Sequence, residues 1–131
     1  MEKELKKIKY HQKILLNIMT YEEPDSALFF HKIIDYDLDE FQVNSLIKLL
    51  TIFEEYLNKN TPFSKETIKE LKKIGLAINN DFLCEENILS EFEKCITTLG
   101  INIKIKYLLL SLKKQYLHEN LCNQLLKKIQ D

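Results

Sequence analysis

Few residues in this chain of 131 residues can interrupt a helix: it contains only two glycines and two prolines. Pro24 and Pro62 stand where the helical spacing of apolar residues is broken, and each disfavours helix at the residue before it. Hydrophobic residues make up 45% of the chain, which is enough at this length to bury one core without a metal or a disulfide. We therefore predict an all-α fold, a single compact bundle of five or six helices in one domain over residues 1–131.

Apolar residues recur at three- and four-residue steps along most of the chain, as they do in helices that pack on a core. The first expected helix covers about residues 2–20, and the second begins after Pro24, with Asp25 or Ser26 as its cap, and carries Leu28 to Ile34. The others cover about 37–58, 63–74, 85–98 and 101–116, followed by a tail over residues 117–131. Asp37 and Glu40 form a capping box that starts the third helix, and Gly100 is the left-handed residue that ends the fifth. Residues 79–81, which read Asn-Asn-Asp, supply a turn.

Residues 101–116 carry two conflicting patterns. Ile101, Ile103 and Ile105 alternate with polar residues as in a strand, whereas the apolar residues from Ile105 to Tyr116 fit a helix. Because no partner strand is evident, we predict a helix. The apolar residues of the tail lie on a stripe displaced from the preceding one, so a bend or break is expected within residues 117–120.

The first expected helix carries one line of residues at alternating three- and four-residue steps. The line consists of Leu5, Ile8, Gln12, Leu15 and Met19. This heptad-like spacing is typical of a helix that pairs with another helix, and a polar residue at one position can set the register of the pair. The line spans less than three heptads, so it also fits a plain helix that faces the core of its own chain. We predict that it is an interaction surface and that residues 2–20 form an assembly arm.

All 19 basic residues are lysine, and arginine is absent. Arginine supplies the planar fork for bidentate binding of phosphate, and clustered glycines let backbone amides surround phosphate, so both devices are scarce here. Codon bias in an AT-rich genome is an alternative explanation for the absence of arginine. Residues 1–20 hold five lysines and two acidic residues, and residues 101–131 hold six lysines and two acidic residues. Residues 21–100 hold eight lysines and sixteen acidic residues, so both ends are basic and the middle is acidic. The basic ends can pack on the acidic middle of the same chain or of a neighbour, or they are ordinary solvated faces.

The cysteines and the N-terminal residues indicate the cellular compartment of the protein. Cys84, Cys95 and Cys122 form an odd set without a CxxC pair, which favours reduced, buried thiols in a cytoplasm. The opening residues are charged rather than apolar, so no signal peptide is expected. No apolar run approaches the roughly 18 residues that cross a bilayer. We predict a cytoplasmic protein without a membrane partner.

No calcium-binding pattern is complete. Asp35, Asp37 and Asp39 imitate the start of an EF-hand loop, in which alternate carboxylates converge on the ion. Glu40 stands where that loop needs glycine, and Leu46 stands where it needs a bidentate glutamate. The acids are therefore interpreted as helix-capping residues.

The remaining polar residues offer no catalytic or metal centre. His118 and Cys122 are one helical turn apart, but a zinc site needs three or four ligands. None of the three histidines follows a glutamate at the spacing that di-iron bundles use. The pairs Glu54-Glu55 and Glu85-Glu86 are expected to face solvent. We predict no catalytic residue, no metal, no cofactor and no enzymatic activity.

Nucleic-acid binding is the alternative function. Ile68 to Ile88 has the order of a helix-turn-helix motif, but its second helix begins with Glu85-Glu86 and holds two further glutamates, which repel phosphate. The lysine-rich ends, Lys3 to Lys13 and Lys104 to Lys128, are better candidates for a nonspecific phosphate contact. Nucleic acid is therefore a disfavoured partner.

A set of mostly apolar residues in the N-terminal half recurs in a known pattern over about residues 5–57. The set consists of Leu5, Ile8, Tyr10, Ile14, Leu15, Leu16, Leu28, Phe29, Ile33, Ile34, Asp35, Leu38 and Glu40. It resembles a small family of Bacillus proteins typified by YhaI, with a looser likeness over 63–88 that fades near Gly100. The chain departs from the family by an insertion around Pro24 and a tail after Tyr116. The resemblance implies an all-α fold and a cytoplasmic location, and it carries over no catalytic residue.

Taken together, these patterns predict a non-enzymatic protein-interaction or self-assembly module. One form of such a module is a regulator or inhibitor that occupies the surface of another protein. The expected partner is another protein or a second copy of the chain.

Overall fold

The computed structural model describes residues 1–59, 63–78, 84 and 86–130, and within these residues it contains helices and no strand. The elements are α1 (Glu2–Ile18), the 3₁₀ helix η1 (Pro24–Ala27), α2 (Leu28–Asp35), α3 (Glu40–Lys59), α4 (Lys65–Lys73), α5 (Ile88–Thr98), α6 (Ile105–Lys114) and α7 (Glu119–Gln130). The all-α class is confirmed. The predicted five or six helices are corrected to seven α-helices in the described residues, because the C-terminal part of the chain forms two separate helices.

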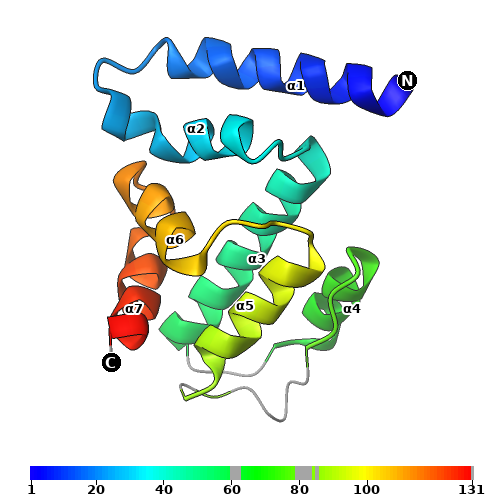
Figure 1. Cartoon of the computed structure of the whole chain (residues 1–131). Helices are drawn as coiled ribbons and strands as arrows, with labels where there is room; N and C mark the ends of the chain where they lie inside the picture. Colours follow the sequence, from blue (N-terminus) through cyan, green and yellow to red (C-terminus); the bar gives the residue numbers. More distant parts are fainter. Residues whose placement is uncertain (60–62, 79–83, 85, 131) are drawn as a thin grey trace.

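The helices are arranged with α1 at one end of the molecule (Figure 1). α1 lies across α2, and α2 in turn packs on α6. α3 begins near the end of α2 and runs away from α1, with α7 packed against it and α6 packed on α7. Because α2 has neighbours on two sides, it is a central helix, as its largely apolar sequence indicates.

The core is built around α3. Leu46, Leu49, Leu50 and Phe53 are all 0% exposed, and their three- and four-residue spacing places them on one side of the helix. The ring of Phe53 lies 5.5 Å from the ring of Phe92 on α5 in an edge-to-face arrangement. Burying a side chain of this size contributes roughly 1.5–3 kcal/mol, so this cluster fixes α3 against α5.

The helix cap at the start of α3 differs from the predicted one. Asp39 Oδ1 accepts a hydrogen bond from the backbone N–H of Gln42 at 2.8 Å, and Gln42 Oε1 accepts one from the backbone N–H of Asp39 at 3.0 Å. The capping box is therefore Asp39 with Gln42, and the prediction of Asp37 with Glu40 is wrong. A residue that caps must lie directly before the helix, and Asp37 is already used to end α2.

Four helices end in the same way. Each has a residue in the left-handed region two positions after its last helical residue, and the next backbone N–H bonds back to a carbonyl five residues earlier. The left-handed residues are Asp37 (φ 55°), Gly75 (φ 87°), Gly100 (φ 76°) and Tyr116 (φ 60°) after α2, α4, α5 and α6. The prediction that Gly100 takes this position is confirmed.

The segment between α5 and α6 corrects the predicted helix over 101–116. Residues 101–104 are not helical, and α6 begins only at Ile105. Ile101 and Ile103 are 4% and 5% exposed, so the alternating pattern belongs to a short non-helical segment that buries every second residue without a partner strand. The helical pattern belongs to the residues that follow it. The bend or break predicted around residues 117–120 is confirmed as a break over 115–118, because α6 ends at Lys114 and α7 begins at Glu119.

Several smaller predictions also have an outcome. α1 ends at Ile18 rather than at Thr20, and Ser64 caps α4 by accepting the backbone N–H of Thr67 at 3.1 Å. Cys95 and Cys122 are buried as predicted, whereas Cys84 is exposed. The predicted turn at 79–81, the predicted loop at Pro62 and the predicted start of a helix at residue 85 lie outside the described residues. None of the described helices has both the length and the apolar character that crossing a membrane requires.

Candidate functional site

One face of α1 packs on the rest of the molecule. Ile14 is 6% exposed, and Tyr10 and Ile18 are partly buried against the core. These residues follow one another at four-residue steps and therefore share one side of the helix. Only this side is covered.

A second face of α1 is exposed and carries the residues predicted to form an interaction surface, here named the apolar seam. The seam consists of Leu5 (53% exposed), Ile8 (55%), Gln12 (exposed), Leu15 (48%) and Met19 (79%). At 3.6 residues per turn this face lies about a third of a turn around the helix from the packed face. The seam therefore contributes little to the core of its own chain.

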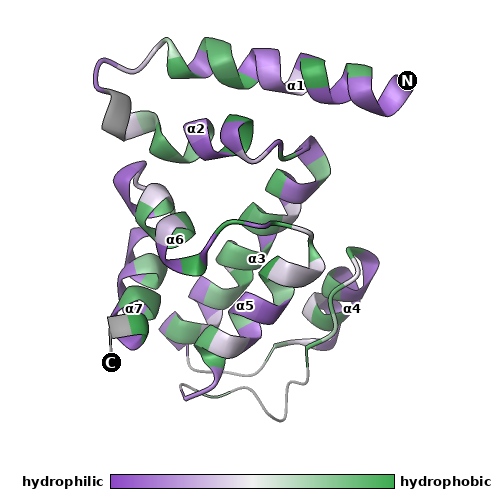
Figure 2. Cartoon of the chain, viewed as in Figure 1, coloured by the Kyte–Doolittle hydropathy of each residue, from purple (hydrophilic) through white to green (hydrophobic). Residues whose placement is uncertain are grey.

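Two apolar residues beside the seam were missed by the sequence analysis. Leu16 is 64% exposed and Met1 is fully exposed. Met1 precedes Leu5 by four residues and continues the seam toward the N-terminus, whereas Leu16 widens it. Figure 2 shows hydrophobic segments alternating with hydrophilic ones along α1. An exposed apolar stripe of this extent on one helix is the kind of surface that other proteins bind.

Polar contacts fix the orientation of α1 and thereby of the seam. Lys7 Nζ lies 3.0 Å from Asp37 Oδ2, in the turn between α2 and α3. His11 Nε2 donates a hydrogen bond to the carbonyl oxygen of Leu38 at 2.7 Å, and its Nδ1 lies 3.9 Å from Asp37 Oδ1. Both side chains reach toward the molecule, so the seam is left facing outward.

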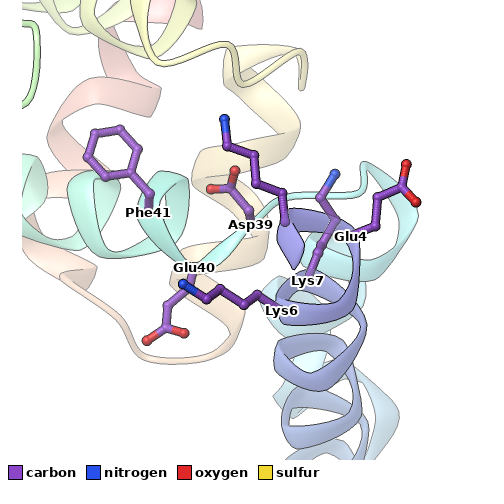
Figure 3. A pocket seen from close by; sticks show the side chains of 7 residues that line it. Glu4, Lys6, Lys7, Asp39, Glu40 and Phe41 are labelled. Carbon is purple, nitrogen blue, oxygen red and sulfur yellow. The ribbon is translucent and has the colours of Figure 1, made fainter. Parts of the chain in front are cut away.

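A cavity of about 330 Å³ lies where the start of α1 meets the start of α3 (Figure 3). It is lined by Lys3, Glu4, Lys6, Lys7, Asp39, Glu40 and Phe41. The three lysines of α1 face the carboxylates of Asp39 and Glu40 at the start of α3, so charges of opposite sign compensate each other across it, whereas Glu4 lies on the α1 side. The basic start of the chain thus packs on the acidic middle of the same chain, which is one of the arrangements considered from the charge distribution.

The same acidic residues act on Tyr10. Burial, and then the negative charges of Glu40 and Asp39, raise the pKa of the Tyr10 hydroxyl to about 12. Tyr10 therefore stays protonated and serves as packing rather than as a proton acceptor.

A pair formed by a histidine and a carboxylate joins α3 to the α6–α7 junction, and the sequence analysis missed it. His118 Nδ1 donates a hydrogen bond to Glu54 Oε2. The side chains are 18% and 26% exposed, so the prediction that Glu54 faces solvent is wrong. The two residues are 64 positions apart, and nothing in their local sequence signals the contact.

Among the residues that the structure describes, the hydroxyl and the thiol nearest this pair are not activated as nucleophiles. His118 Nε2 lies 3.5 Å from Thr51 Oγ1, but that hydroxyl already donates to the carbonyl oxygen of Ile47 at 3.1 Å. Burial raises the pKa of the Cys122 thiol to about 12, with the charge of Glu54 adding to the effect, so no thiolate is available. Catalysis by such a site needs an activated hydroxyl or thiolate. The pair instead ties α7 to α3.

His118 and Cys122, which the sequence analysis considered as two zinc ligands and rejected as too few, lie at this same junction. In the described part of the chain, no group of three or more histidine, cysteine, aspartate or glutamate residues could hold a metal ion. The thiol of Cys122 donates a hydrogen bond to the carbonyl oxygen of Leu117, with 3.6 Å between Sγ and the oxygen.

The two basic ends of the chain lie far from each other. In Figure 1 the N-terminal end of α1 and the C-terminal end of α7 are on opposite sides of the molecule. The first turn of α1 and the last turn of α7, which hold the lysines nearest the two chain ends, are therefore separated by the body of the molecule.

Comparisons with protein families, with curated proteins and with solved structures found no match for this chain. The resemblance to the YhaI family therefore stays a prediction, and the functional argument depends on the geometry above.

Proposed function

We propose that the chain is a non-enzymatic protein-interaction module whose binding surface is the apolar seam of α1. The observation that carries this proposal is that all five seam residues are exposed although α1 is fixed to the molecule by its other face. Four of the five side chains are apolar, and burying them against a partner gives the largest favourable free-energy change available to this helix.

The geometry of the surface supports a helix as the binding element of the partner. The seam is a narrow stripe along one straight helix, and apolar side chains at three- and four-residue steps interlock with the same spacing on a second helix. A regulator or inhibitor that covers a helix of its target would use a surface of this kind.

Affinity capture from a lysate of the source organism tests the proposal. The tagged wild-type chain is compared with the Ile8→Asp/Leu15→Asp variant, with and without nuclease. A matched control, Lys13→Asp/Asn17→Asp, places two aspartates on an exposed part of α1 away from the seam. We expect bound protein, including untagged copies of the chain, to survive nuclease, to be lost with the seam variant and to be kept with the control.

Two results would contradict the proposal. Protein that the seam variant still captures would show that the binding surface lies elsewhere. Capture of nuclease-sensitive nucleic acid alone would favour the alternative, a nucleic-acid-binding regulator that uses the lysine-rich terminal helices.

A further inference from the structure

We propose that the apolar seam binds the apolar seam of a second copy of the chain, with the two α1 helices parallel and in register. This inference rests on the proposed function and names the partner for the same surface. The arguments come from the spacing of the seam, from Gln12 and from two charged residues that border the seam.

The spacing of the seam fits a pair of helices that wind around each other. Steps of three and four residues average 3.5 residues, the repeat that keeps one face of a helix against its partner. Leu5, Gln12 and Met19 form one set at seven-residue intervals, and Ile8 and Leu15 form the other. In a parallel pair in register, each residue lies opposite the same residue of the second copy.

Gln12 selects this register. It is the single polar residue of the seam, and its amide carries both hydrogen-bond donors and an acceptor. In the parallel pair the two Gln12 side chains face each other and can hydrogen-bond, as buried polar residues do at such positions. An antiparallel pair brings each set of positions opposite the other set, so Gln12 would be buried against Ile8 or Leu15 without a partner for its amide, which is unfavourable.

Glu4 and Lys9 add charge complementarity. Both side chains are exposed, they border the seam on opposite sides, and neither forms an ion pair in the part of the chain that the structure describes. They are five residues apart, whereas ion pairs along one helix form at three or four residues. In a parallel pair, Glu4 of each copy lies beside Lys9 of the other copy, so the dimer gains two ion pairs that one chain cannot make.

Repulsion between the two lysine-rich helix starts does not oppose this orientation. Lys7 is paired with Asp37 at 3.0 Å, and Lys3 and Lys6 share a cavity with Asp39 and Glu40. Residues 1–20 hold five lysines and two glutamates. The side chains of Asp37, Asp39 and Glu40 add three negative charges, so the net side-chain charge of this region is zero. Two such ends can therefore lie side by side.

A charge exchange tests the parallel pairing. Dimer dissociation constants of the purified chain are measured by sedimentation equilibrium for Glu4→Lys, for Lys9→Glu and for the double exchange. Each single change replaces two attractive contacts by two repulsive ones, and we expect the dissociation constant to rise on the order of tenfold. The double exchange restores both pairs and should return the constant to near the wild-type value. Lys13→Glu, which lies outside the seam, is the matched control and should leave it unchanged.

Disulfide cross-linking reports the orientation independently. The exposed Cys84 is first removed by Cys84→Ser, and Leu5→Cys is then oxidised at a concentration where the dimer forms. We expect Leu5→Cys to cross-link to itself, because the two copies of residue 5 are adjacent in a parallel pair. Cross-linking only after mixing with Leu15→Cys, a residue of the other set, would show an antiparallel pair and overturn the inference.

The outcomes separate this inference from the proposed function. A purified chain that stays monomeric while the lysate capture remains dependent on the seam would overturn the second copy as partner and leave the interaction function standing. A monomeric chain with no capture that depends on the seam would overturn both. A double exchange that binds as weakly as the worse single variant would overturn the parallel register alone.

Discussion

Ile8 and Ile14 are the same residue type on the same helix, yet their side chains are 55% and 6% exposed. Their spacing in the sequence predicts that they lie on different sides of α1, but it does not predict which side is covered. The covered side is decided by α2 and by the contacts of Lys7 and His11 with the α2–α3 turn, which join residues about 30 positions apart.

The two isoleucines give a matched test of which face belongs to the core. Ile14→Ala leaves a cavity against α2 and should lower the free energy of unfolding by about 2 kcal/mol or more. Ile8→Ala removes an exposed side chain and should change it by less than about 0.5 kcal/mol. Urea unfolding followed by circular dichroism, at a concentration where the chain is monomeric, measures both values. An equal loss for both variants would show that the seam is part of the core.

The buried thiols and Tyr10 make stability depend on alkaline pH. Burial raises the pKa of Cys95 and of Cys122 from 9.0 to about 12, and burial with nearby carboxylates raises that of Tyr10 from 10.0 to about 12. The unfolded chain therefore loses these protons at lower pH than the folded chain does. The stabilisation is complete below about pH 9 and is lost as the pH rises toward 12. We expect the urea midpoint to fall over this range, and to fall less in Cys122→Ala than in the wild type; equal slopes would contradict the assignment.

At the scale of the elements, the sequence was most informative where local chemistry alone decides the structure. Gly100 ends α5 as expected, and Ser64 caps α4, because a glycine after a helix and a serine before one act within their own turn. Asp37 and Tyr116 end α2 and α6 by the same left-handed geometry, but neither residue type signals it. The capping box of α3 was predicted at Asp37 instead of Asp39 because the sequence did not show that Asp37 ends α2.

The candidate site was predictable in part. The seam follows from spacing within one helix, so its residues could be named from the sequence, whereas its exposure depends on packing between helices. The pair of His118 with Glu54 could not be found, because it joins the α6–α7 junction to α3 across 64 positions. A single sequence gives no signal for a contact of that range.

The two left-handed residues of the α6–α7 junction provide a test at this scale. Tyr116 (φ 60°) is 76% exposed and buries little, so Tyr116→Gly should leave the free energy of unfolding unchanged or raise it by up to about 1 kcal/mol. His118 (φ 51°) is also left-handed, but His118→Gly removes the bond to the half-buried Glu54 and should lower that free energy by about 1–2 kcal/mol. Thermal and urea unfolding of both variants measure these changes in the free energy of unfolding. A gain in stability for His118→Gly would mean that the pair does not hold α7 on α3.

At the scale of the whole molecule, α1 differs from the other helices because it lies at one end and packs mainly on α2. α2 to α7 enclose the main core, whereas α1 contributes one buried residue, Ile14. A helix held in this way can present a stripe to a partner without disturbing the core behind it. The central claim is therefore that the seam is an interface that is not needed for folding.

Sedimentation equilibrium of the purified wild-type chain and of Ile8→Asp/Leu15→Asp, combined with circular dichroism of the same samples, tests that claim most directly. The account predicts that the wild type self-associates, that the variant is a monomer, and that both have the same helical content and the same thermal midpoint within a few degrees. Loss of helical content in the variant would show that the seam is core. A wild type that stays monomeric at every concentration would contradict the self-assembly that we propose.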